Sequence, residues 1–164
     1  MSRGGTAVTA FIGLGANLGD AVAAMDAACT ALGALPDTRL VARSRLYRSA
    51  PVGVTGQPDY INAVVQLSTS LSARAVLEAL MRIEADNGRT REYHMAPRTL
   101  DMDLLLHGDT VVNEPELTVP HPRMHQRAFV LAPLAELAPQ TIIPGVGRVA
   151  DLLPTVADQA ISPL

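Results

Sequence analysis

The chain of 164 residues is 48% hydrophobic and 18% charged, with a formal net charge of −3. This balance excludes a disordered chain, and no apolar run approaches the roughly 20 residues of a membrane span. The single cysteine, Cys29, excludes a disulfide framework, and the absence of lysine leaves arginine, backbone amides or metal to hold any phosphate. We therefore expect one globular domain over residues 1–164, working in the cytoplasm as a monomer without a membrane or nucleic-acid partner.

The first part of the chain predicts a strand, a helix and a second strand. Residues 7–14 (AVTAFIGL) form a mostly apolar run that glycines end, which is typical of a strand. Asp20 can cap the following helix, which Gly33 ends. Residues 40–48 predict a second strand, and 49–59 predict a long Pro/Gly-rich loop. The predicted apolar face of the helix consists of Val22, Met25, Cys29 and Leu32.

The second part predicts a strand, a helix and a strand again. Residues 60–68 form the third predicted strand, and Ser72 caps a helix that ends at Gly88. An arginine-containing loop over 88–98 precedes the fourth strand, 99–106. A turn at Gly108 and Asp109 then leads to a short strand at 110–112, and the tail contains a helical piece around Phe129, Leu131, Leu134 and Leu137.

This order of elements predicts an α+β fold with a ferredoxin-like βαββαβ core. The expected sheet is mostly antiparallel with the core helices packed on one face, followed by a C-terminal extension. We find no internal repeat and no linker that would divide the chain.

Asp101 and Asp103 lie one residue apart on the fourth predicted strand. Alternate residues of a strand point to the same face, so both carboxylates point to one side. Two carboxylates aimed into one site can hold a hard cation such as Mg²⁺, or two ions that clamp a phosphate chain. Taken alone, this pattern is more often a solvated acidic face. The apolar residues of the strand face the other way: Leu100, Met102, Leu104 and Leu106.

Arginines and histidines surround this acidic pair in the sequence. Arginine suits bidentate phosphate contacts, so carboxylates together with arginines indicate a polyphosphate and its metal. Each of these residues taken alone is at least as often a solvated surface residue. They are Arg89, Arg91, Arg98, His121, Arg123, His125 and Arg127.

The segment GLGANLG (13–19) invites comparison with a dinucleotide-binding loop. Its glycine spacing is one residue off the G-x-G-x-x-G pattern, and two strands without an intervening helix follow, which breaks the βαβ repeat. We interpret the glycines instead as tight packing of the strand onto its helix.

Tyr60 and Phe129 are two of the five aromatic residues. Two rings can sandwich a flat heterocycle, and Asn62, on the strand face of Tyr60, could hydrogen-bond its edge. The alternative interpretation is that both rings fill the core.

Several stretches, above all PRTLDMDLLL (97–106) with LTVPHP (117–122) downstream, resemble the 6-hydroxymethyl-7,8-dihydropterin pyrophosphokinase family of folate biosynthesis. The resemblance covers almost the whole chain. It implies an ATP-dependent diphosphokinase that transfers pyrophosphate to the pterin hydroxymethyl group and yields AMP. The other matching stretches are FIGLGANLGD (11–20), SRLYRSAPVG (44–53), QPDYINAVV (57–65), GRTR (88–91) and the rest of 117–139.

The resemblance also implies roles for individual residues. Asp101 and Asp103 would hold two Mg²⁺ ions, and Arg89 and Arg98 would act in catalysis. The ATP-binding residues would be Glu84, Arg91, Leu104, His121 and Arg127. The pterin-binding residues would be Ser49, Ala50, Val52, Tyr60, Asn62 and Phe129.

Some positions depart from the family pattern. Met95 stands where a tryptophan is frequent, Pro122 where an aromatic residue is frequent, Ala50 where a proline is frequent, and Met81 where glutamine is expected. These changes affect the expected loop and adenine contacts, not the acidic pair.

Two other classes of protein share this topology. A regulatory domain would bind Mg²⁺-ATP without producing AMP. An RNA-binding sheet module would need exposed aromatic residues and a basic face, which the sequence lacks.

Overall fold

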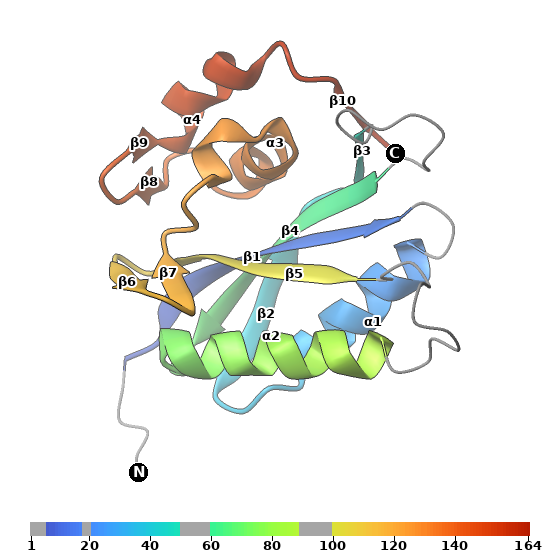
Figure 1. Ribbon diagram of the computed structural model, residues 1–164, viewed down its shortest axis with the longest axis vertical. Coiled ribbons are helices and arrows are strands. Elements are labelled where there is room, and N and C mark those ends of the chain that lie inside the picture. Colours follow the sequence, from blue (N-terminus) through green and yellow to red (C-terminus); the bar gives the residue numbers. More distant parts are fainter. Residues whose placement is uncertain (1–5, 18–20, 50–59, 89–99) are drawn as a thin grey trace.

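The computed structural model describes residues 6–17, 21–49, 60–88 and 100–164. An antiparallel sheet forms its centre, with the strand order β10-β3-β4-β1-β5, and β2 pairs with β4 as well (Figure 1). The strands are β1 (Val8–Asn17), β2 (Thr38–Arg43), β3 (Tyr47–Ser49), β4 (Tyr60–Thr69), β5 (Asp101–His107) and β10 (Ile161–Pro163).

Helix α1 (Ala21–Gly33) follows β1, and helix α2 (Ala73–Gly88) connects β4 to β5. The predicted α+β, ferredoxin-like core is therefore confirmed. Because β1 is antiparallel to both of its neighbours, no parallel βαβ unit of the dinucleotide-binding kind is formed here. No helix in the described part of the chain is long and apolar enough to cross a membrane.

The sheet separates two hydrophobic clusters. Ala10, Ile12 and Leu14 of β1 belong to the cluster that also contains buried residues of α1 and α2, whereas Phe11 belongs to the cluster under α3 (Ala128–Leu137). Figure 1 shows α1 and α2 on one side of the sheet and α3 on the other. The predicted helical piece in the tail is α3, and it covers the sheet face that the two core helices leave open.

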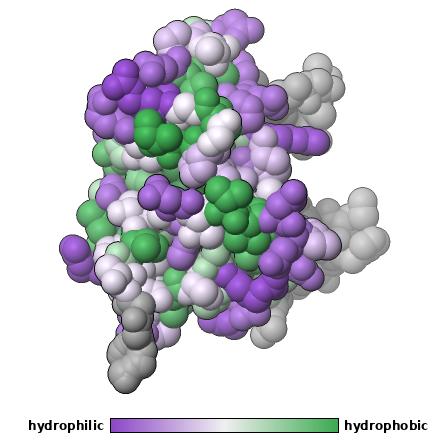
Figure 2. Space-filling view, turned by 90° about the vertical axis from the view of Figure 1, so that its left-hand side faces the viewer, coloured by the Kyte–Doolittle hydropathy of each residue, from purple (hydrophilic) through white to green (hydrophobic). Residues whose placement is uncertain are grey.

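The C-terminal half adds short elements to this frame. Gly108 has a φ of 56°, which suits the predicted turn, but the strand after it begins at Val112 rather than at residue 110. Figure 2 shows the side that carries the small hairpins, where apolar surface occurs as separate patches among hydrophilic residues. The short elements are β6 (Val112–Glu114), β7 (Leu117–Val119), η1 (Met124–Gln126), β8 (Ile142–Ile143), β9 (Gly147–Arg148), α4 (Val149–Leu152) and η2 (Leu153–Val156).

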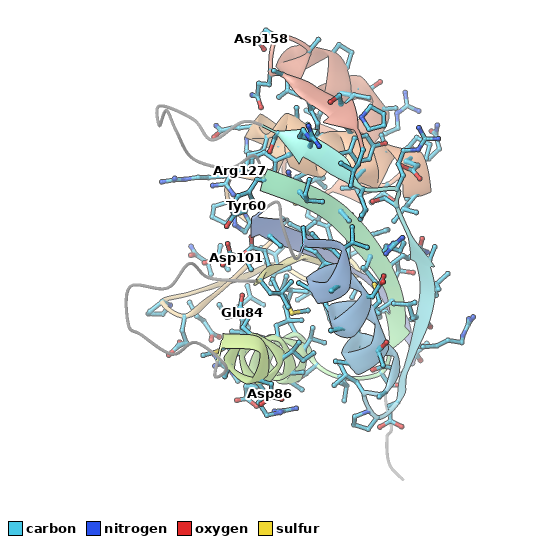
Figure 3. The ribbon with its side chains drawn as sticks, turned by 90° about the vertical axis from the view of Figure 1, so that its right-hand side faces the viewer. Tyr60, Glu84, Asp86, Asp101, Arg127 and Asp158 are labelled. Carbon is cyan, nitrogen blue, oxygen red and sulfur yellow. The ribbon has the colours of Figure 1, made fainter. Side chains whose placement is uncertain are left out.

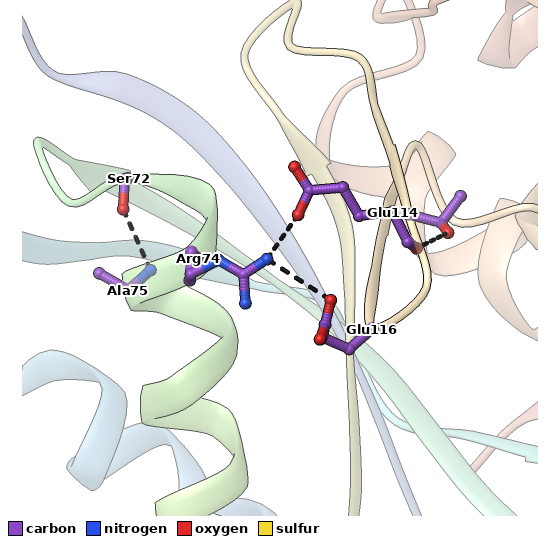
Figure 4. Close-up of polar contacts among 6 residues, drawn as sticks. Ser72, Arg74, Ala75, Glu114 and Glu116 are labelled. Atoms are coloured by element: carbon purple, nitrogen blue, oxygen red, sulfur yellow. Dashed lines mark hydrogen bonds and ion pairs between the residues drawn. The ribbon is translucent and has the colours of Figure 1, made fainter.

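The start of α2 is fixed by local polar contacts. The amide of Ala75 donates to Ser72 Oγ at 3.1 Å, so the predicted cap is confirmed (Figure 4). In the first turn of the helix, Arg74 Nη2 lies 2.5 Å from Glu114 Oε1 and 3.8 Å from Glu116 Oε1, which ties the β6-β7 hairpin to α2.

The buried face of α1 differs from the predicted one. Val22 is 50% exposed, and Cys29 is only partly buried. The buried stripe begins one residue earlier and is mostly alanine, because small side chains let the helix lie close to the sheet. It consists of Ala21, Ala24, Met25, Ala28 and Leu32.

The strand predicted over 40–48 is interrupted, so β2 and β3 pair with successive parts of β4. Ser44 lies in the interruption and is 1% exposed. Its amide donates to Val64 O at 2.9 Å, and its hydroxyl accepts from Val64 N at 3.0 Å and donates to Arg45 O at 2.8 Å. The Ser44 hydroxyl therefore takes the place of the backbone carbonyl that would accept from the Val64 amide in a regular sheet.

The substitution Ser44→Ala is expected to lower the free energy of unfolding by about 1–3 kcal/mol, since it leaves the buried amide of Val64 without an acceptor. Urea unfolding measures this change, with the exposed Ser162→Ala as the control. An unchanged midpoint and slope for Ser44→Ala would show that the hydroxyl is dispensable.

Candidate active site

A cavity of about 530 Å³ opens between the start of β5 and the start of α3. It lies on the sheet face that α1 and α2 do not cover, and β1, β4, β5, α3 and residues 159–160 form its walls. Its volume is in the range of small-ligand sites. The structure brings seven of the predicted site residues to this cavity: Ser49, Tyr60, Asn62, Asp101, Asp103, Arg127 and Phe129.

The acidic pair points into the cavity, as strand alternation predicts. Asp101 is partly buried and Asp103 is exposed, whereas Met102 between them is buried in the opposite core cluster. On the neighbouring strand, Gly15 pairs with Asp101 and Gly13 pairs with Asp103. Cross-strand partners place their side chains side by side, so the missing side chain of Gly15 leaves room beside Asp101 that the Tyr60 ring occupies, and the Leu105 side chain lies against Gly13.

The apolar face of β5 changes side before the strand ends. Ile12 pairs with Leu104, but Phe11 pairs with Leu106, so one extra residue is inserted in β5. The prediction that Leu106 shares a face with Leu104 is therefore wrong: Leu106 lies in the cluster under α3 together with Leu105. This shift leaves the two acids unaffected, because it follows them.

Tyr60 connects the acidic pair to the ring-lined part of the cavity. Its hydroxyl donates to Asp101 Oδ2 at 2.5 Å. The side chain reaches from β4 to β5 across β1, and it does so over Gly15, where an added Cβ would lie 3.0 Å from Tyr60 Cε2. The glycine thus permits this contact. The interpretation of Gly13 and Gly15 as strand-to-helix packing is wrong, because they line the cavity on the other face; Gly19 lies outside the described residues.

We expect Gly15→Ala to displace the Tyr60 ring and to weaken binding of any planar ligand in the cavity, by roughly tenfold if about 1.4 kcal/mol of contact is lost. Fluorescence titration with the pterin that the sequence resemblance implies measures the effect. Gly33→Ala is the matched control, since its Cβ would meet Leu40 Cβ at an ordinary 3.7 Å outside the cavity. Equal affinities for the two variants would contradict this role of Gly15.

Asn62 is a buried amide on the floor of the cavity. It is 3% exposed, and its Nδ2 donates to Ser49 Oγ at 2.8 Å. Its Oδ1 lies near Gly15, on the cavity side of the sheet. A buried amide has more donor and acceptor capacity than this one bond uses, so it can bind the polar edge of a ligand.

Arg127 and Phe129 form the wall opposite the sheet, at the start of α3. The Arg127 guanidinium lies over the Phe129 ring, 5.5 Å from its centroid. Phe129 is partly buried and packs against the cluster under α3 while it also lines the cavity. The core-filling and ligand-facing interpretations therefore both apply to this ring.

Figure 3 shows Arg127, Tyr60, Asp101 and Glu84 one below another along the same side of the molecule. Glu84 extends this row from α2 but does not line the cavity. Its Oε2 accepts from the amide of Met102 at 2.6 Å, so it holds the β5 backbone between the two acids. Glu84 therefore fixes the position from which the carboxylates project.

Two further predicted residues lie outside the cavity. Leu104 is 5% exposed and packs in the core on the side of α1 and α2. His121 Nδ1 accepts from the amide of Arg123 at 3.1 Å. Burial lowers the pKa of His121, Asp103 opposes this, and Arg127 and Arg123 reinforce it. The imidazole is therefore neutral at pH 7 and carries its hydrogen on Nε2.

The remaining predicted site residues lie outside the described part of the chain. They are Ala50, Val52, Arg89, Arg91 and Arg98.

Among the cavity residues that sequence reasoning missed as parts of a site, Gly13, Gly15 and Gln159 bear most on its geometry. Gly13 and Gly15 have the same spacing as Asp101 and Asp103, which is visible in the sequence. That each glycine pairs with one of the acids could be recognised only once the register between β1 and β5 was known. Gln159 had no local motif, since tertiary structure alone brings it to the cavity.

This geometry fits an enzyme that holds a planar, polar-edged ring beside a pair of carboxylates. The family model for 7,8-dihydro-6-hydroxymethylpterin-pyrophosphokinase (HPPK) matches residues 11–139. The 2-amino-4-hydroxy-6-hydroxymethyldihydropteridine pyrophosphokinase of Haemophilus influenzae is 42% identical over 92% of this chain and 94% of that protein. The enzyme of the same name from Pseudomonas aeruginosa is 45% identical over 87% and 88%.

The chain therefore belongs to the HPPK family, as its sequence motifs predicted. The predicted class, an ATP-dependent pyrophosphokinase of folate biosynthesis, is confirmed with it. A crystal structure of wild-type Plasmodium falciparum HPPK-DHPS with pterin and p-hydroxybenzoate shares the fold, with a TM-score of 0.75 at 13% identity. The match covers 96% of this chain and 44% of that longer one.

Proposed function

We propose that this chain transfers the pyrophosphoryl group of ATP to the hydroxymethyl oxygen of 6-hydroxymethyl-7,8-dihydropterin, in the cavity between β5 and α3. One observation carries this proposal. The same cavity contains two strand-borne carboxylates, an aromatic side chain hydrogen-bonded to one of them, and a buried amide. The two carboxylates suit a metal-bound phosphate chain, and the aromatic ring and the amide suit a pterin.

The pterin subsite consists of the rings of Tyr60 and Phe129 with the amide of Asn62. Offset stacking on a ring and hydrogen bonds to a buried amide together orient a flat heterocycle. The hydrogen bond between Asn62 and Ser49 supports this subsite, because it fixes the orientation of the amide. Ala50 and Val52, next along the chain, complete the pterin contacts in this proposal.

The donor set at Asp101 and Asp103 suits Mg²⁺. This ion binds one or two protein carboxylates and completes its octahedron with water and phosphate oxygens. Within the described ranges no three His, Cys, Asp or Glu side chains are grouped closely enough to hold a metal, so a zinc site with three or four protein ligands does not match them. Two such ions, when bound, neutralise charge on the triphosphate.

The nucleotide subsite lies on the side of Asp103 and Arg127. Arg127 supplies a fixed positive charge, and neutral His121 can donate a hydrogen bond from Nε2. Glu84 positions the β5 backbone, and Leu104 belongs to the same strand. Arg89, Arg91 and Arg98 complete the phosphate contacts in this proposal, with Arg89 and Arg98 stabilising charge in the transition state.

The transfer itself requires no protein nucleophile. The substrate hydroxyl attacks the β-phosphorus, a new P–O bond forms, the bond to the α-phosphate breaks, and AMP leaves. Cys29 takes no part, because it lies on α1 on the opposite side of the sheet and burial raises the pKa of its thiol. Positioning and charge neutralisation then account for the catalysis.

The identity of the product tests this proposal. Protein, Mg²⁺, ATP and 6-hydroxymethyl-7,8-dihydropterin are mixed, and the nucleotide product is separated by chromatography. We expect AMP in a one-to-one ratio with pterin diphosphate. ADP would show simple phosphoryl transfer, and ATP binding without turnover would favour the regulatory domain.

We also propose that the chain works as one domain and as a monomer, in the cytoplasm where ATP is available. The sheet shared by both hydrophobic clusters supports the single domain.

A further inference from the structure

The C-terminal segment returns to the active-site cavity. The family match ends at residue 139, yet Gln159 and Ala160 line the cavity. Directly after them, β10 adds a strand to the edge of the sheet beside β3. The segment thus lies against the proposed pterin subsite and away from the acids on β5.

The side chain of Gln159 holds the start of α3. Its Oε1 accepts from the amide of Ala128 at 2.9 Å, and its Nε2 donates to Gln126 O at 2.8 Å. The first amides of a helix have no partner within the helix, and the cap residue Arg127 makes no capping bond with its own side chain. Gln159 supplies that bond from 31 residues further along the chain.

The C-terminal segment also contacts the opposite wall of the cavity, which β3 and β4 form. Ile161, two residues after Gln159, pairs with Ser49 in the sheet. Ser49 in turn accepts the hydrogen bond from Asn62 Nδ2. One short stretch therefore joins the wall that carries Arg127 and Phe129 to the wall that carries Asn62.

We propose that Gln159 is a positioning residue for the pterin. It fixes the start of α3, and hence the Phe129 ring, relative to the amide of Asn62. This inference rests on the proposed function, because it assumes that the pterin occupies this cavity. Its two hydrogen bonds go to backbone atoms of η1 and α3 and none goes to β5, so its loss displaces the start of α3, which carries Phe129 and Arg127, and leaves the two acids of β5 in place.

The test compares Gln159→Met, which keeps the length of the side chain, with Gln159→Glu, which keeps the acceptor for Ala128. We expect Gln159→Met to raise KM for the pterin roughly tenfold, as the loss of two ordinary hydrogen bonds would. The kcat should stay within about twofold, because the acids on β5 keep their place, and KM for ATP should rise less than KM for the pterin, because Arg127 is one of several proposed ATP contacts. Gln159→Glu should recover part of the loss, because a carboxylate is favourable at a helix N-terminus.

The matched control is Gln140→Met, which removes a glutamine that accepts from Arg148 Nη1 at 2.9 Å outside the cavity. Equal pterin KM values for Gln159→Met and this control would overturn the inference, as would a parallel loss in kcat and ATP affinity. Direct titration of the pterin by its fluorescence decides the same question without turnover. If wild-type protein makes no AMP, the proposed function fails, and this titration still tests Gln159.

Discussion

Asp103→Asn is expected to lower kcat on the order of 10³-fold, because one of the two carboxylates proposed to hold Mg²⁺ becomes neutral. Asparagine has nearly the same shape, and Asp103 is exposed, so the fold should tolerate the change. AMP production at saturating ATP and pterin gives kcat, and a thermal melt confirms folding.

The matched control for this variant is Asp109→Asn, an exposed acid in the turn after β5 and outside the cavity. It should retain full activity with an unchanged dependence on Mg²⁺. A kcat for Asp103→Asn close to that of the control would rule out the metal role of this carboxylate.

Asn62→Leu is expected to raise KM for the pterin on the order of 10²-fold, since polar groups on the heterocycle would be buried without partners. Leucine has the same number of side-chain heavy atoms as asparagine and the same branching at Cγ, so it is the apolar residue nearest to it in shape. The KM for ATP should stay near its wild-type value, because Asn62 lies on the opposite side of the cavity floor from Asp103. Steady-state kinetics with each substrate varied in turn separate the two constants.

The exposed Asn113→Leu on β6 serves as the control for this variant. An equal increase in both KM values for Asn62→Leu would indicate a general distortion of the sheet. No change in either value would place the pterin elsewhere.

Local pattern was enough to predict the core of the fold. Helical spacing and the cap at Ser72 gave α2, and strand alternation placed Asp101 and Asp103 on one face. The failures occurred where tertiary contacts override local pattern. A buried serine hydroxyl interrupts the strand at Ser44, and an inserted residue on β5 turns Leu106 to the other layer.

The candidate site was predictable only in part for the same reason. The acids, the two rings and Asn62 lie on strands or in motifs that a sequence displays. Gly15 depends on the register between β1 and β5, and on a tyrosine that crosses over it. The role of Gln159 depends on its contact with Ala128, 31 residues earlier in the chain. A contact of this kind produces no periodic pattern in the sequence.

The central claim is that Asp101 and Asp103 bind divalent cations within the cavity that holds the pterin. Paramagnetic broadening of backbone amide signals by Mn²⁺, added with an unreactive ATP analogue, tests it most directly. The account predicts broadening centred on these two acids and on Gly13 and Gly15, and its loss in Asp103→Asn. Broadening centred instead on Glu114 and Glu116, the acids that contact Arg74, would contradict the account.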